Sequence, residues 1–190
     1  MSFATDEEFH RMLARLLSDQ AASESSRHLL LSCLGYLEQL PADTAPAVGS
    51  LLESPSRKLR GEAIRLVVNS NSYSGFQKAV EAMAIKPGEH PLIRATALEG
   101  IAGHGGSLSN KQFAVAEGLL SDPESAPEVK RQAAQALSRL AVRQESPDQA
   151  RALVRLVAAA TPFHLSLLLK PFQNLDPGQW PNQELDALGA

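Results

Sequence analysis

The stretch PEVKRQAAQALSRL, residues 127–140, decides the fold because it recurs along the chain. Its apolar residues fall at helical spacing, which predicts an amphipathic helix. Similar segments are PLIRATALEGIAGH, RKLRGEAIRLVVNS and SSRHLLLSCLGYLE before it and PFHLSLLLKPFQNL after it. In chain order, equivalent positions lie 33, 34, 36 and 35 residues apart. So constant a spacing indicates a structural repeat.

A second helical segment precedes each copy, beginning with DEEFHRMLARLLSD, for which Thr5 or Asp6 is the expected N-cap. Proline fits the first turn of a helix, and glycine often ends one. The prolines expected at early helical positions are Pro91, Pro127 and Pro162. The run GIAGHGGSLS also invites a phosphate-loop interpretation, but its glycines follow a helix and no GK[ST] appears. We therefore expect Gly103 to Gly106 to end a helix.

These patterns predict an all-α fold, an α-solenoid of antiparallel helix pairs, because one pair cannot bury its apolar face alone. The solenoid spans residues 1–190 as a single unit, with pairs at approximately 5–40, 44–70, 73–104, 109–143 and 147–175. A sixth pair begins at 182 and is truncated. Its unpaired helix would expose Leu185 and Leu188, so we expect a dimer or a docked partner at this C-terminal edge.

The repeat resembles HEAT repeats, which form armadillo-type superhelices, and this resemblance implies that the α-solenoid is right-handed. PEVKRQAAQALSRL and PLIRATALEGI are similar to the second HEAT helix, with its Val-Arg pair and the alanines and leucine that follow. HEAT repeats often pair that Arg with an Asp about six residues earlier. The corresponding positions here are Ala21, Ser54, Gly88 and Glu124. An Asp–Arg ladder is therefore not expected, except between Glu124 and Lys130.

Residues 91–190 show a narrower resemblance, carried by GHGGSLSNKQF, APEVKRQAAQALSRL, SPDQARALVRLVAAATPFHLSLLLKPFQN and PNQELDALGA. Their order is similar to the helical-repeat region of large multidomain c-type cytochromes of planctomycete bacteria. The resemblance implies a spacer, cut from a larger haem-containing protein. No CxxCH haem motif occurs, so no redox residue or cofactor is implied for this chain. Its location would be periplasmic in such a parent and cytoplasmic if the chain stands alone, and no signal peptide is recognisable.

Composition narrows the classes of partner. The net charge is −3 and aromatic residues make up 5%, which argues against a nucleic-acid-binding protein. The second helices nevertheless carry a set of basic residues, namely Arg57, Lys58, Arg60, Arg65, Lys130, Arg131 and Arg139. The alternative that the HEAT resemblance implies is an enzyme on a HEAT-like fold, either an alkylpurine-type DNA glycosylase, for which these basic residues would suit DNA, or a tetrapyrrole lyase. No stretch approaches the ~20 apolar residues of a membrane span, so no membrane insertion is expected.

Catalytic and metal sites are not predicted. No two of the five histidines have the i, i+3 or i+4 spacing of a helical metal site. Cys33 is the only cysteine, and its leucine neighbours predict a thiol packed within a helix. No serine has the GxSxG context of a nucleophile. We expect neither a cofactor nor an enzymatic activity of this chain.

The candidate binding face lies opposite the buried stripe of each second helix, because solenoids bind partners along such surfaces. In the segment at 127–140 the stripe comprises Val129, Ala133, Ala136, Leu137 and Leu140. Opposite it, and at equivalent positions of the other copies, lie His28, Ser32, Arg65, Glu99, Arg131, Gln135 and Lys170. These side chains are small or of mixed charge. The pattern fits either contact with a protein or a neighbouring domain, or residues that are merely exposed. The predicted function is a non-catalytic scaffold.

Overall fold

The computed structural model describes residues 7–19, 21–37, 39–140 and 147–173 of the chain. These residues form ten α-helices and three short 3-10 segments, and no strand occurs among them. The prediction of an all-α fold is confirmed. The expected N-cap at Thr5 or Asp6, the sixth pair from 182 and its residues Leu185 and Leu188 lie outside the described residues.

The helices alternate in the order that the repeat predicts. In pairs along the chain they are α1 (Glu7–Ser18) and α2 (Glu24–Leu34), α3 (Ala45–Leu52) and α4 (Arg57–Asn69), α5 (Gln77–Ile85) and α6 (Pro91–Gly105), α7 (Asn110–Ser121) and α8 (Pro127–Ser138), and α9 (Pro147–Ala158) and α10 (Pro162–Leu168). The 3-10 segments are η2 (Ala42–Thr44), η3 (Tyr73–Gly75) and η4 (Lys170–Phe172). Each quoted segment of the repeat therefore contains one α-helix.

Local sequence explains where the helices begin and end. Three second helices, α6, α8 and α10, each start with the expected proline. Ser109 and Gln112 form a reciprocal capping box at the start of α7, which satisfies two backbone N–H groups. At the end of α6, Gly106 takes the left-handed conformation, with φ 63°, that closes a helix. The glycine-rich run is thus a helix terminus and not a phosphate loop.

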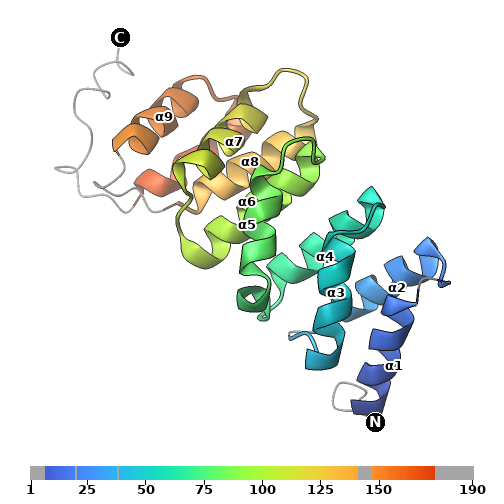
Figure 1. Ribbon diagram of the computed structural model, residues 1–190. Helices are drawn as coiled ribbons and strands as arrows, with labels where there is room; N and C mark the ends of the chain where they lie inside the picture. Colours follow the sequence, from blue (N-terminus) through green and yellow to red (C-terminus); the bar gives the residue numbers. More distant parts are fainter. Residues whose placement is uncertain (1–6, 20, 38, 141–146, 174–190) are drawn as a thin grey trace.

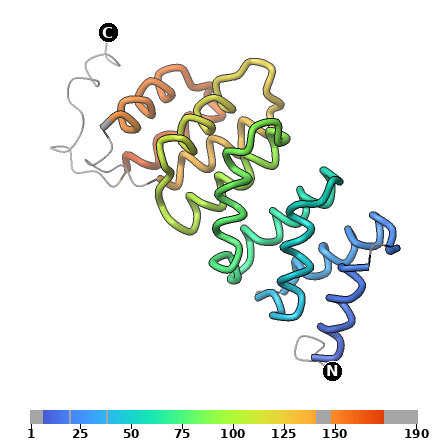
Figure 2. Tube along the Cα trace, in the orientation of Figure 1, coloured from blue at the N-terminus to red at the C-terminus, as the bar shows by residue number. Residues whose placement is uncertain are grey.

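The helices pack in chain order into an elongated array of two layers (Figures 1 and 2). Each second helix contacts the next, so that α2, α4, α6, α8 and α10 form a continuous series. Within each pair the first helix packs against the second, and α1–α3, α5–α7 and α7–α9 are in contact as well. The two ends of the described chain, α1 and α9–α10, lie at opposite ends of the array. Contacts therefore join mainly neighbouring pairs.

The core is one continuous cluster of hydrophobic, mainly aliphatic, side chains that runs through all five pairs. The predicted stripe of α8 is buried, and Ala134 on the same helix is buried too. At the α4–α6 contact, Gly100 allows a close approach: a Cβ atom there would lie 2.6 Å from the Cβ of Val68, well inside van der Waals contact. The absence of a side chain at Gly100 thus sets how closely α4 and α6 approach.

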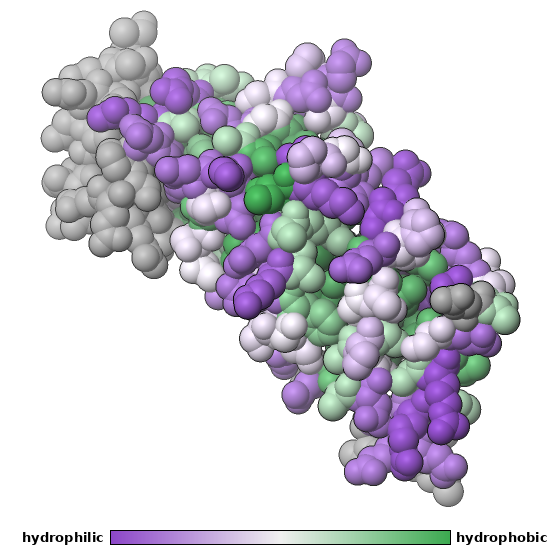
Figure 3. Space-filling view, viewed as in Figure 1, coloured by the Kyte–Doolittle hydropathy of each residue, from purple (hydrophilic) through white to green (hydrophobic). Residues whose placement is uncertain are grey.

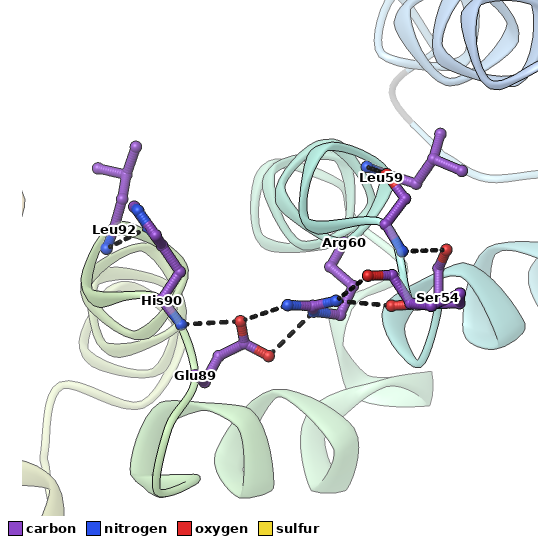
Figure 4. A network of polar contacts seen from close by, with 8 residues as sticks. Ser54, Leu59, Arg60, Glu89, His90 and Leu92 are labelled. Carbon is purple, nitrogen blue, oxygen red and sulfur yellow. Dashed lines mark hydrogen bonds and ion pairs between the residues drawn. The ribbon is translucent and has the colours of Figure 1, made fainter.

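A buried ion pair joins the second pair to the third (Figure 4). Arg60 on α4 donates two hydrogen bonds to the carboxylate of Glu89, in the connection before α6, at 2.9 and 2.8 Å. The side chains of Arg60 and Glu89 are 17% and 1% exposed. The carboxylate also accepts from the His90 backbone N–H at 2.8 Å. Because both oxygens of Glu89 are bonded, its burial leaves no unpaired charge.

The recurring cations of the second helices make structural contacts, although not the ladder of HEAT repeats. Arg60 Nη1 donates to the backbone oxygen of Ser54, six residues earlier, at 2.7 Å. Arg94 Nε donates to the Ala84 oxygen at 3.3 Å. Lys130 Nζ donates to the Pro123 backbone oxygen at 3.3 Å. This backbone contact stands where we expected a pair with the Glu124 carboxylate. For Arg60, Arg94 and Lys130, backbone carbonyls at the end of the preceding first helix or in the turn after it thus take the place of the missing Asp.

The prediction that Cys33 is a packed thiol is wrong. Cys33 lies in α2, as expected, but it is exposed. The leucines that suggested burial divide between two sides of the helix: Leu34 is 1% exposed and Leu29 is 64% exposed. α2 belongs to the first pair, which has a described neighbouring pair on one side only.

Candidate functional site

The structure places the seven predicted face residues on four of the second helices and one 3-10 segment. His28 and Ser32 lie on α2, Arg65 on α4, Glu99 on α6, Arg131 and Gln135 on α8, and Lys170 in η4. All of them are partly or fully exposed. Lys170 is not on α10, because that helix ends at Leu168. The ring of Pro171 disfavours the α-helical conformation at the residue before it, which is Lys170.

Glu62 on α4 connects two of the predicted residues. Its carboxylate lies 3.3 Å from Nε2 of His28 on α2 and 3.2 Å from Nη1 of Arg65, one turn further along α4. The side chain of Glu62 is 20% exposed, whereas that of Arg65 is 55% exposed. The carboxylate therefore sits at the base of this part of the face, with the guanidinium reaching outward.

Arg131 organises the part of the face on α8. Its Nε donates to Glu128 at 3.1 Å and its Nη1 donates to Gln135 at 2.9 Å. The hydrogen bonds from Arg131 lower the pKa of Glu128 from its usual value, and the positive charges of Arg131 and Arg65 lower it further.

Glu99 is held by a residue that the face prediction did not include. Nη2 of Arg139, which follows the last turn of α8, lies 3.1 Å from the carboxylate of Glu99 on α6. Their side chains are 49% and 20% exposed, respectively. A further polar bridge between the same helices joins Thr96 to Gln132 at 2.6 Å. Polar pairs thus connect α2 to α4 and α6 to α8.

Two hollows lie beside the Glu62–Arg65 pair. One, of about 250 Å³, lies between α2 and α4 and includes Ser32 and Tyr36 in its wall. The other, of about 310 Å³, lies between α4 and α6 and includes Gly61 and His90. Both are open grooves between adjacent second helices, and Glu62 and Arg65 line both. A space-filling view shows hydrophilic and hydrophobic side chains interleaved on one face of the array (Figure 3).

This arrangement can bind a partner through hydrogen bonds and exchange of ion pairs. On the face itself Arg65 and Arg131 each have a carboxylate partner on their own helix. Such exposed pairs contribute little to stability, so a partner could replace one member at small cost. Among the described residues, no group of three or more His, Cys, Asp or Glu residues is placed to hold a metal ion. Nor is any helix in the described ranges long and apolar enough to cross a membrane.

Sequence reasoning missed the partners of the face residues. Glu62, Glu128 and Arg139 complete the ion pairs described above, but none occupies the position opposite the buried stripe. For Glu62 and Glu128 a signal was available, because each carboxylate precedes its arginine by three residues on the same helix. Arg139 and Glu99 are 40 residues apart, and only the stacking of α6 on α8 brings them together.

No protein-family model matches this chain. A search of curated proteins also finds no match.

Proposed function

We propose that the chain is a HEAT-like, right-handed α-solenoid whose function is to bind other proteins or neighbouring domains as a non-catalytic scaffold. The observation that carries this proposal is the continuous contact of α2, α4, α6, α8 and α10. A series of second helices presents one extended surface, and extended surfaces of this kind are the usual binding sites of helical repeats.

The polar bridges between successive second helices support the same proposal. His28–Glu62 and Arg139–Glu99 join neighbouring second helices, and the cationic partners His28 and Arg139 remain 31% and 49% exposed. Rigid positioning of exposed polar groups lowers the entropy lost when a partner binds. The two grooves beside Arg65 give this mixed-charge surface concave sites in which side chains of a partner can lie.

Site-specific photocross-linking tests the scaffold proposal. A benzophenone amino acid would replace Ser32 or Gln135 on the second helices, and Arg15 or Arg155 on α1 and α9 as matched exposed controls. We expect adducts with one identifiable partner from the second-helix positions only. The purified partner should then bind the unlabelled chain and lose affinity for Arg131→Glu. Equal adducts from both sets of positions, or none from either, would contradict the proposal.

The spacer role in a larger haem-containing protein extends this proposal, and it rests on the resemblance of residues 91–190 alone. The test is to determine the coding sequence on both sides of this segment in the genome. A reading frame that continues into a CxxCH motif supports the spacer role. A frame that carries no such motif would leave the scaffold proposal standing and rule the spacer out.

A further inference from the structure

A polar hollow outside the second-helix face lies where η3, α5, the end of α6 and the start of α7 meet. It has a volume of about 470 Å³, within the usual range for ligand pockets. Tyr73, Glu81 and His104 contribute to its wall, together with the buried Ile101 and Gln112. None of the predicted face residues lines it.

The described residues that line this hollow include a negatively charged side chain but no lysine or arginine. Among these described residues, Glu81 is the one carboxylate. Glu81 accepts a hydrogen bond from Gln77 Nε2 at 2.8 Å, which occupies one carboxylate oxygen. No ion pair to Glu81 occurs within the described part of the chain. A partly buried carboxylate without a cation is an electrostatic site for a positive group.

Two stacked rings form another part of the wall. Tyr73 and His104 lie parallel, with centroids 4.1 Å apart and planes inclined by 5°. Tyr73 is buried whereas His104 is exposed, so His104 is the outer ring of the pair. Nε2 of His104 lies 2.9 Å from the Val68 carbonyl oxygen. Because that oxygen only accepts, Nε2 is the ring nitrogen that carries a hydrogen and donates it to the carbonyl.

We propose that this hollow binds a cationic side chain, arginine or lysine, of a partner protein. Glu81 would neutralise the charge, and the exposed aromatic ring would pack against the guanidinium or the aliphatic stem. The site deepens the proposed scaffold function, on which it rests for its partner, by adding a specificity pocket beside the main binding face. Burial and then the negative charge of Glu81 raise the pKa of the neighbouring Tyr73 hydroxyl, so this part of the wall is a neutral phenol and adds no second negative charge.

NMR titration of the full, 15N-labelled chain with the peptide acetyl-Gly-Arg-Gly-amide tests this site directly. We expect saturable amide shifts at η3, α5 and the end of α6. The same peptide with citrulline in place of arginine keeps the shape but loses the charge, and should bind at least about tenfold more weakly. Glu81→Gln should weaken binding of the arginine peptide by a similar factor. Glu117→Gln, a carboxylate of α7 outside the hollow, serves as the matched control and should leave binding unchanged.

Three results would overturn the proposal. The first is the absence of amide shifts at the hollow when the arginine peptide is present at about 1 mM and in 20-fold excess over the chain. The others are equal affinity of the chain for the citrulline and arginine peptides, and an undiminished affinity of the Glu81→Gln variant for the arginine peptide. The comparison of the two peptides uses the unmutated chain, so it does not depend on the folding of a variant. It is also independent of the photocross-linking. Peptide binding without cross-links from the second helices would support the hollow as a binding site and contradict the proposed second-helix face. Cross-links from the second helices without peptide binding would support that face and contradict the hollow.

Discussion

Replacing Glu89 with glutamine removes the negative member of the ion pair that joins α4 to the start of α6. The variant leaves the Arg60 guanidinium, 17% exposed, with backbone partners but without a countercharge. Breaking a buried ion pair by removing one member costs about 3–5 kcal/mol. Because Arg60 retains its bonds to Ser54 and Pro55 and some contact with water, we expect the lower end, about 3 kcal/mol. For a chain of this size that corresponds to a fall in Tm of roughly 6–12 °C.

The pH dependence of this cost provides a second, independent signature. Burial by itself would raise the pKa of Glu89, but the hydrogen bonds from Arg60 and His90 and the charges of Arg60 and Lys86 hold it below 4.5. A carboxyl whose pKa is lowered on folding stabilises the protein fully above its unfolded pKa, and this contribution disappears as the pH falls through the folded pKa. The difference between wild type and Glu89→Gln should therefore be constant from pH 6 to 7 and shrink below about pH 4.5.

Urea unfolding followed by circular dichroism measures both effects. Glu128→Gln is the matched control, because its carboxylate also pairs with an arginine but is 53% exposed, and we expect it to cost less than about 1 kcal/mol. Combining Glu89→Leu with Arg60→Met should recover most of the loss, since a buried pair exchanged for apolar side chains is often neutral. If Glu89→Gln costs no more than Glu128→Gln, or if its cost is the same at pH 4 and pH 7, the buried pair does not join the second and third helix pairs as described.

Three further changes test other contacts. Gly100→Ala should destabilise the chain by about 1–3 kcal/mol in urea unfolding, because the added methyl group meets α4. Gly118→Ala, with open space around it on α7, should stabilise by about 0.5–1 kcal/mol, and a loss at both positions would refute the packing argument. Arg94→Ala should lower stability by about 1 kcal/mol and leave partner affinity unchanged, whereas lost affinity at unchanged stability would make it a binding residue. Sedimentation of the Leu185→Asp, Leu188→Asp double variant should show a monomer where the wild type dimerises, and a wild type that is monomeric at high concentration would contradict the predicted C-terminal contact.

The helices and their ends could be predicted from the sequence because each depends on local residues. Pro127 at the start of α8 and Gly106 after α6 act within one turn of chain, and the apolar spacing of residues 127–140 is visible without a partner. Burial on a second side of the helix, as at Ala134, depends on which helices flank it. Cys33 shows the same limit, since Leu31 and Leu34 pack on a side of α2 that the exposed Cys33 does not share.

The polar contacts between pairs could not be predicted because they join residues of different copies of the repeat. The HEAT resemblance places the expected acidic partner of Arg60 six residues earlier, at position 54, which is a serine. The charge partner is Glu89, which lies in the turn 29 residues later. Loops vary in length between repeats, so a residue there has no fixed register to compare. His104 and Tyr73 are likewise brought together only when the end of α6 meets η3.

The central claim is that the five helix pairs stack as an elongated solenoid, and small-angle X-ray scattering of the purified chain tests it most directly. A compact domain of this length would have a radius of gyration of about 16 Å. The account predicts a value clearly larger, with a pair-distance distribution that has an extended tail. It also predicts that the profile calculated from the described array accounts for the main peak of that distribution. A radius near 16 Å with a symmetric, single-peaked distribution would contradict the stacked arrangement.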